Sequence, residues 1–117
     1  MTASDSSKIY KILSRVQWDR FQLERQFEGA ELDLADGFIH FSAANQLAET
    51  LAKHFPRRTD LWLIEVQAGQ LQNLKWEPSR DGQLFPHLYE TLCLEDVSDS
   101  WELSVDDSGV HQLPVLS

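Results

Sequence analysis

The segment Leu61-Trp-Leu-Ile-Glu-Val66 is almost continuously apolar and constrains the fold more than any other part of the chain. A strand that solvent reaches on one face alternates apolar and polar residues, whereas a strand covered on both faces reads as an unbroken apolar run. The sequence therefore predicts a central strand over 61–66 with other elements packed on both of its faces.

Shorter segments in which apolar, aromatic and β-branched residues alternate with polar ones predict further strands before and after this run. They cover 8–13, 38–42, 74–77, 85–89 and 101–105. Pro78 and Asp81-Gly82 stand in the loop between the third and the fourth of these segments. Such turn residues predict a hairpin-like connection between the two strands.

The first of two main helices is predicted directly after the first strand. Ser14 and Gln17 have the spacing of a capping box, in which each side chain binds a backbone amide of the other residue. The following residues up to Gly29 carry two separate apolar stripes. The sequence leaves open which of these stripes is buried.

The second main helix is predicted between Ser42, which we expect as its N-cap, and Pro56, which ends it. Its apolar residues recur at the spacing of one buried stripe. They are Ala44, Leu47, Ala48, Leu51, Ala52 and Phe55. The polar residues 31–37 before it are predicted as a loop that ends in the turn Asp36-Gly37.

Strands mixed with two main helices, without strict alternation, predict an α+β fold with a small, mostly antiparallel sheet. The chain has 117 residues, which is the usual size of one compact domain. We expect this domain over 8–105, with flexible tails at 1–7 and 106–117.

The charges are unevenly placed along the chain. All ten basic residues lie at or before Arg80, whereas eight of the nineteen acidic residues follow it, and the net charge is −9. This distribution excludes general nucleic-acid binding and binding to an anionic membrane surface, because both need a basic face. A solvated acidic surface is the simplest explanation, and a basic protein partner is an alternative.

Cys93 is the single cysteine, so the chain forms no internal disulfide, and we expect a reducing, cytoplasmic location. No apolar run approaches the roughly 18 residues that cross a bilayer. The four histidines show no spacing typical of a metal site, so no metal is predicted.

The first candidate functional residues lie in the predicted strand 38–42. His40 stands between two apolar residues, where an imidazole can face a cleft and exchange protons, or can bind a backbone carbonyl within the core. Ser42 lies on the same face of a strand as His40, and its alternative role is the helix cap.

Two further candidate segments combine aromatic and titratable residues. Trp76, Glu77 and Arg80 surround a turn and form either a recognition loop or a surface ion pair. Phe85, His87 and Tyr89 share one face of a strand. That face can stack a planar ring such as nicotinamide or adenine, or can belong to the core.

Lys11 and Glu65 are charged residues within predicted strands. A charged group in a buried strand needs a partner, so Lys11 either meets an anion or lies at a strand end. Glu65 is a candidate partner for Lys11 and a candidate base; exposure at a strand end is the alternative for both residues.

Four segments together resemble the small bacterial family called domain of unknown function 952. They are Ile9–Ile12, Leu34–Ser42, Leu63–Val66 and Lys75–Tyr89, and the resemblance runs from about Lys8 to Val97. That family is similar in fold to ADP-ribosyltransferases and to the RNA 2′-phosphotransferases that consume NAD. The resemblance implies a split, mostly antiparallel sheet with a cleft between its halves.

In that superfamily a first strand carries Tyr-His-Gly-Thr and a second carries a His in a pattern like Ile-His-Leu-Ser. His40 in Phe38-Ile-His-Phe-Ser42 matches the second pattern, whereas Tyr10-Lys-Ile-Leu13 departs from the first. The resemblance implies a ligand of the nucleotide, NAD or ADP-ribose type and a glycosyl (ADP-ribosyl) transfer. A non-catalytic module that binds a small metabolite or a protein is the alternative.

Under the first of these hypotheses, the candidate residues have separate roles. His40 would orient or protonate the substrate, and Glu77 or Glu65 would stabilise a cationic, oxocarbenium-like sugar. The candidate ligand-binding residues are Lys11, Ser42, Trp76, Arg80, Phe85, His87 and Tyr89. NAD or ADP-ribose is the candidate cofactor, and the sequence leaves the oligomeric state open.

Overall fold

The computed structural model describes residues 7–79 and 82–116 and has an α+β fold with mostly antiparallel sheets, as predicted. Within these residues the α-helices are α1 (Arg15–Glu24), α2 (Glu31–Asp36) and α3 (Leu47–His54). The strands are β1 (Lys8–Ser14), β2 (Gln26–Phe27), β3 (Ile39–His40), β4 (Leu61–Gln67), β5 (Leu74–Pro78), β6 (Leu84–Leu88), β7 (Leu92–Cys93), β8 (Val97–Val105) and β9 (His111–Gln112). Short 3₁₀ turns precede α3 and follow β4 and β7. Residues 1–6 of the expected tail 1–7, Ser117 of the expected tail 106–117, and Arg80 and Asp81 of the predicted loop lie outside the described residues.

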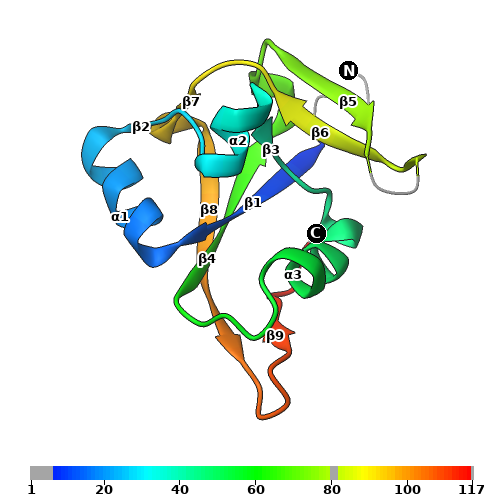
Figure 1. Ribbon diagram of the computed structural model, residues 1–117. Helices are drawn as coiled ribbons and strands as arrows, with labels where there is room; N and C mark the ends of the chain where they lie inside the picture. Colours follow the sequence, from blue (N-terminus) through cyan, green and yellow to red (C-terminus); the bar gives the residue numbers. More distant parts are fainter. Residues whose placement is uncertain (1–6, 80–81, 117) are drawn as a thin grey trace.

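The larger sheet has the strand order β1-β4-β8-β9 (Figure 1). Strand β4 lies between β1 and β8 and pairs antiparallel with both, so the prediction of a central strand over 61–66 is confirmed. Leu61, Leu63, Ile64 and Val66 are completely buried. The chain beyond Val105 turns back and adds β9 to the edge of this sheet.

The second sheet has the order β3-β6-β5, with the expected hairpin between β5 and β6. Figure 1 shows β5 and β6 at the upper right, and β3 closer to the larger sheet, near β1. An isolated bridge joins the two sheets, because the backbone amides of Tyr10 and Ser42 each donate to the carbonyl of the other at 2.8 Å. The residues that follow His40 therefore connect the second sheet to β1.

Helix α1 begins as the sequence predicts. The Ser14 hydroxyl accepts from the Gln17 amide, and the Gln17 side chain accepts from the Ser14 amide. Of the two apolar stripes, the one with Trp18 and Phe21 is buried. The helix ends at Glu24 rather than near Gly29, because Arg25 takes a left-handed conformation that closes it.

Two expectations for the region around α2 and α3 are wrong. Residues 31–36 form α2 instead of a loop, and Gly37, at φ 87°, closes that helix in a left-handed conformation that suits glycine. Ser42 does not cap a helix: its hydroxyl binds that of Thr50, and a 3₁₀ turn over 44–46 comes before α3.

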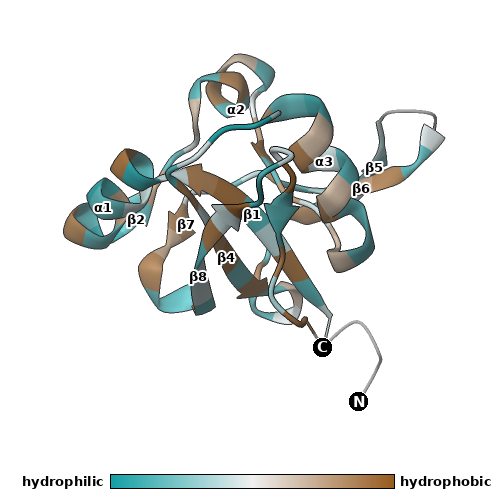
Figure 2. Ribbon diagram, turned by 90° about the horizontal axis from the view of Figure 1, so that it is seen from below, coloured by the Kyte–Doolittle hydropathy of each residue, from teal (hydrophilic) through white to brown (hydrophobic). Residues whose placement is uncertain are grey.

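The core contains two clusters of buried side chains, one on each face of the larger sheet. One includes Trp18, Phe21 and Phe27 of the α1 and β2 region, and the other includes Leu47 and Leu51 of α3. In Figure 2 the apolar colours run along the central strands, and the outer faces of α1 are mostly polar. Both faces of β4 are thus covered, which explains its unbroken apolar sequence.

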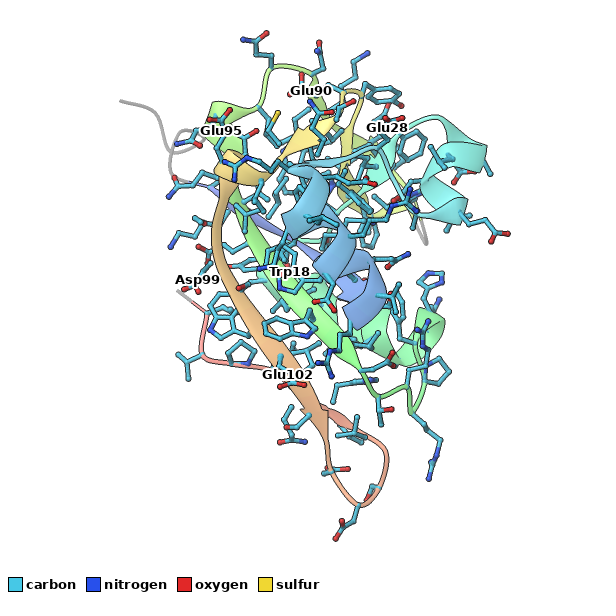
Figure 3. The ribbon with its side chains drawn as sticks, turned by 90° about the vertical axis from the view of Figure 1, so that its left-hand side faces the viewer. Trp18, Glu28, Glu90, Glu95, Asp99 and Glu102 are labelled. Carbon is cyan, nitrogen blue, oxygen red and sulfur yellow. The ribbon has the colours of Figure 1, made fainter. Side chains whose placement is uncertain are left out.

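Among the described acidic residues that follow residue 80, Asp99 and Glu102 lie on β8, and Glu95 and Asp96 lie in the turn before it. Figure 3 shows Glu90, Glu95, Asp99 and Glu102 on this side of the molecule, with Trp18 between α1 and the strands. Among the described residues, no helix has the length and apolar character that a membrane span requires.

Candidate functional site

A cleft of about 410 Å³ lies between β1 of the larger sheet and the strands β3 and β6 of the second sheet. Residues of α2 line one side, and residues of α3 and the loop after it line the other. Figure 1 shows α2 and α3 on opposite sides of β1. The volume is within the range of about 300–1,000 Å³ that is typical of small-molecule sites.

His40 is held between two carboxylates at one end of the cleft. Its Nδ1 lies 2.7 Å from Oδ1 of Asp33, and its Nε2 lies 2.9 Å from Oδ2 of Asp36. A carboxylate accepts hydrogen bonds and donates none, so both contacts are hydrogen bonds only when both ring nitrogens carry protons. Asp33 is buried and fixes the ring, whereas Asp36 is exposed at the rim.

Asp33 also binds the ammonium group of Lys11. The Lys11 Nζ lies 3.1 Å from Oδ2 of Asp33 and donates to the His40 carbonyl at 2.9 Å. The amides of Ala30 and His40 donate to the Asp33 carboxylate as well. One buried carboxylate therefore connects α2, β1 and β3.

The pKa values of this pair follow from burial and from the mutual contacts. Burial would raise the pKa of Asp33, but the hydrogen bond from His40, the charge of Lys11 and the two backbone amides outweigh it and lower the pKa to about 2. Burial lowers the pKa of Lys11, and the charge and hydrogen bond of Asp33 partly offset that effect.

A second histidine with a carboxylate partner lies opposite His40. His87 pairs directly with His40 in the register of β3 and β6, and its Nδ1 lies 2.8 Å from Oε1 of Glu77. The hydroxyl of Tyr89 donates to the same oxygen at 2.6 Å. The hydrogen bonds from Tyr89 and then His87 lower the pKa of Glu77, so Glu77 remains an acceptor.

The two imidazoles share one aromatic neighbour. The ring of Phe38 stacks on His87 with 4.1 Å between the centroids and lies 4.6 Å from the centroid of His40. The centroids of His40 and His87 are 5.5 Å apart. These contacts restrict both rings, so the structure holds two oriented imidazoles side by side.

The other end of the cleft carries a cation. The cleft follows β1 from Tyr10 to Ser14, and Arg58 lines it in the loop that leads to β4. The amide of Arg15 donates to the Asp60 carbonyl, which holds this loop against the end of β1. No ion pair of Arg58 is found within the described residues, and its guanidinium packs over the Phe55 ring.

Several residues that the sequence predicted for a site are brought together here. The cleft is lined by five of them, namely Lys11, His40, Ser42, Phe85 and His87. Glu77 and Tyr89 do not line the cleft, but they hold His87 from behind through the two hydrogen bonds to Glu77.

Other predicted residues lie elsewhere. Trp76 pairs with Pro86 across β5 and β6, so it points to the opposite face of that sheet from His87. Glu65 accepts from Tyr10 and Ser98 and does not pair with Lys11 as expected, because it lies opposite Tyr10, on the other face of β1. Arg80 is not described.

Three further residues at the cleft, Asp33, Asp36 and Arg58, were not predicted from the sequence. The signal for Asp33 was indirect, since a lysine in a buried strand requires a counter-ion that the pattern alone does not identify. Because Asp36 and Gly37 form a strong turn signal, the sequence predicted a loop there and did not indicate that Asp36 contacts His40. Within the described part of the chain, no group of three potential ligands can hold a metal ion.

Comparison with known proteins identifies the family of the chain. Residues 12–100 match the family described as "Protein of unknown function (DUF952)". The chain belongs to the DUF952 family. The matched DUF952 region includes both histidines, their carboxylate partners and Arg58, and it confirms the family resemblance seen in the sequence.

Solved structures of protein CC0527 from Caulobacter crescentus are similar to this DUF952 chain. The crystal structure is 48% identical, covers 91% of this chain and 94% of that chain, and superposes with a TM-score of 0.87. The solution NMR structure is 49% identical, covers 88% and 90% of the two chains, and gives a TM-score of 0.80. None of the curated proteins compared with the chain matches it.

Proposed function

We propose that the cleft binds a nucleotide of the NAD or ADP-ribose type and that the protein acts at the anomeric carbon of its ribose. The observation that carries this proposal is the placement of two oriented imidazoles at one end of a single cleft and, at the other end, the Arg58 guanidinium, for which no ion pair is found within residues 7–79 and 82–116. Arg58 suits a phosphate group, and the rings of His87 and Phe85 suit a flat or sugar-like group.

The length of the cleft supports an elongated ligand. Lys11 contacts the His40 carbonyl, and Ser14 lies at the end of β1 next to the Arg58 loop. Three residues of an extended strand span about 10 Å, so a ligand that reaches both ends carries its anionic group well away from its reacting group. A nucleotide with a pyrophosphate has this form.

The charges around the imidazoles support chemistry at a sugar. Glu31 and Asp33 line the cleft, and Asp36 and Glu77 contact the two rings. Negative charge stabilises the oxocarbenium-like cation that forms when a bond at the anomeric carbon breaks. The similarity of Phe38-Ile-His-Phe-Ser42 to the second-strand motif of ADP-ribosyltransferases supports the same substrate class.

Isothermal titration calorimetry with ADP-ribose and with NAD tests the proposal. Arg58→Gln should weaken ADP-ribose binding at least about tenfold, because hydrogen bonds to a charged group contribute about 1.5–3 kcal/mol. Arg20→Gln is the matched control, since Arg20 lies on the exposed side of α1 and pairs with Glu24. Absence of binding by both nucleotides, or equal affinities of the two variants, would refute the proposal.

A binding module without catalysis is the second candidate, and the contacts of Lys11 favour it. The ammonium group binds Asp33 and the His40 carbonyl and is thereby neutralised, although it lines the cleft. Under this hypothesis ADP-ribose raises the melting temperature and is recovered unchanged; a ligand at 100 times its dissociation constant adds about 2.7 kcal/mol to stability.

A further inference from the structure

We infer that His40 and His87 form a general acid–base pair, and that the bond they break joins the ribose of the ligand to an oxygen atom. This inference rests on the proposed function and adds the leaving group and the role of each ring. It concerns O-linked ADP-ribose conjugates, whose leaving group is an alcohol, rather than NAD.

The hydrogen-bond partners assign a different role to each ring. Nδ1 of His87 faces a carboxylate and therefore carries the proton, which leaves Nε2 as the basic nitrogen. Within the described residues, no hydrogen bond to Nε2 of His87 is found. His87 is thus placed as the base.

His40 is placed as the acid. Nδ1 lies against the buried Asp33 and Nε2 against Asp36, so when both ring nitrogens carry protons, Nε2 holds a proton that can be transferred. Asp36 is exposed at the rim, with 42% of its side chain accessible, and a substrate oxygen can take its place as acceptor. Asp33 and Glu77 do not touch the substrate and are positioning residues.

The leaving group follows from the presence of an acid. Nicotinamide leaves NAD as a neutral molecule without gaining a proton, so a general acid contributes nothing to that step. An alcohol must gain a proton as it leaves, because an alkoxide is a poor leaving group. A site with an oriented acid next to an oriented base therefore fits an O-glycosidic bond.

The reaction is a hydrolysis in which all atoms are accounted for. The bond between the anomeric carbon and the leaving oxygen breaks, its electron pair passes to that oxygen, and the oxygen takes the proton from Nε2 of His40. Water attacks the anomeric carbon and gives its proton to Nε2 of His87. The products are the free alcohol and ADP-ribose, and solvent returns the proton from His87 to His40.

The test compares two substrates that differ in their need for an acid. One is a peptide with ADP-ribose on a serine hydroxyl, and the other is 4-nitrophenyl ADP-ribose, whose phenolate leaves without a proton. His40→Gln should lower kcat/KM at least about 100-fold on the serine-linked substrate and less than tenfold on the nitrophenyl substrate. His87→Gln should lower kcat/KM on both substrates to a similar extent.

A spectroscopic measurement checks the assignment of the base. Long-range ¹H–¹⁵N spectra of the wild-type protein should show His87 as the tautomer with its proton on Nδ1. The tautomer with the proton on Nε2 would overturn the role of His87, and equal losses of His40→Gln on the two substrates would overturn the role of His40.

The binding data separate this inference from the proposed function. ADP-ribose binding without cleavage of either O-linked substrate would overturn the inference and leave nucleotide binding intact. A second result would also overturn the inference alone. In it the protein releases nicotinamide from NAD at a rate that His40→Gln does not change, and it does not cleave the serine-linked peptide. Absence of any ADP-ribose binding would overturn both.

Discussion

The substitution Asp33→Asn tests how much one buried carboxylate contributes to the stability of this fold. Asp33 is 3% exposed and accepts hydrogen bonds from the amides of Ala30 and His40, from Nδ1 of His40 and from Lys11. An asparagine has the same shape, but its amide group turns one acceptor into a donor and removes the charge.

The contacts of Asp33 give the expected loss in the free energy of unfolding. The pKa of Asp33 is lowered from 3.8 to about 2 in the folded protein, which corresponds to a stabilisation of roughly 2 kcal/mol. The substitution also leaves the buried ammonium of Lys11 without a counter-ion. Removal of one partner of a buried ion pair costs about 3–5 kcal/mol, and we expect a loss of that size.

Urea denaturation at pH 7 measures the loss, and Lys11→Met provides the matched variant. The double variant should recover at least about 1 kcal/mol relative to the sum of the single substitutions, because the unpaired ammonium is then absent. Additive effects, or a loss below about 1 kcal/mol for Asp33→Asn, would refute the importance of this pair.

The stability difference between the wild type and Asp33→Asn should also depend on pH. The pKa of Asp33 is lower in the folded state, so its stabilisation is present above pH 3.8 and is lost as the pH falls towards 2. The stability difference between the wild type and Asp33→Asn should therefore shrink between about pH 4 and pH 2. A difference that stays constant over this range would contradict the lowered pKa of Asp33 in the folded state.

Two other substitutions test the packing around the site. Trp18→Ala should lower the free energy of unfolding in urea by about 3–5 kcal/mol, because Trp18 is buried against Phe21 and Trp62. Val16→Ala, on the exposed side of α1, is the control and should change it by less than about 0.5 kcal/mol. Equal effects of the two substitutions would contradict the burial of the stripe that contains Trp18. Gly29→Ala should destabilise the protein by more than about 1 kcal/mol in thermal denaturation. Gly29 has a φ of 131°, and the new Cβ would lie 2.7 Å from the Cβ of Asp33. An unchanged stability would contradict this close approach.

Much of the fold could be predicted because local patterns agree with their surroundings. The apolar run over 61–66 required cover on both faces, and the larger sheet provides it with α1 on one face and α3 on the other. The capping box at Ser14 depends on only four consecutive residues, so the sequence predicts the start of α1 correctly. Where only tertiary contacts decide, as for the buried stripe of α1, the sequence left the choice open.

Helix α2 and its carboxylates could not be predicted for a related reason. Its six residues carry no apolar stripe towards the core, and the element is held by the left-handed Gly37 and by the contacts of Asp33 with β1 and β3. Such contacts join residues that are distant in the sequence. Periodicity reports which face is buried, but not which charged groups meet there.

The histidine pair shows the same limit. His40 and His87 were each identified from their aromatic surroundings, but the sequence did not indicate that β3 and β6 place them side by side. The sequence also grouped Trp76 with the same candidate residues, whereas the register of β5 and β6 separates it from them by one position and thus by one face of the sheet.

The contacts of Asp33 have a consequence for the evolution of this protein. Two oxygen atoms both neutralise a lysine inside the domain and orient an imidazole that faces the cleft. Selection for higher stability and selection for a different reaction would then act on the same side chain. We expect divergence among relatives to proceed first through exposed rim positions such as Asp36, where a change leaves the interior intact.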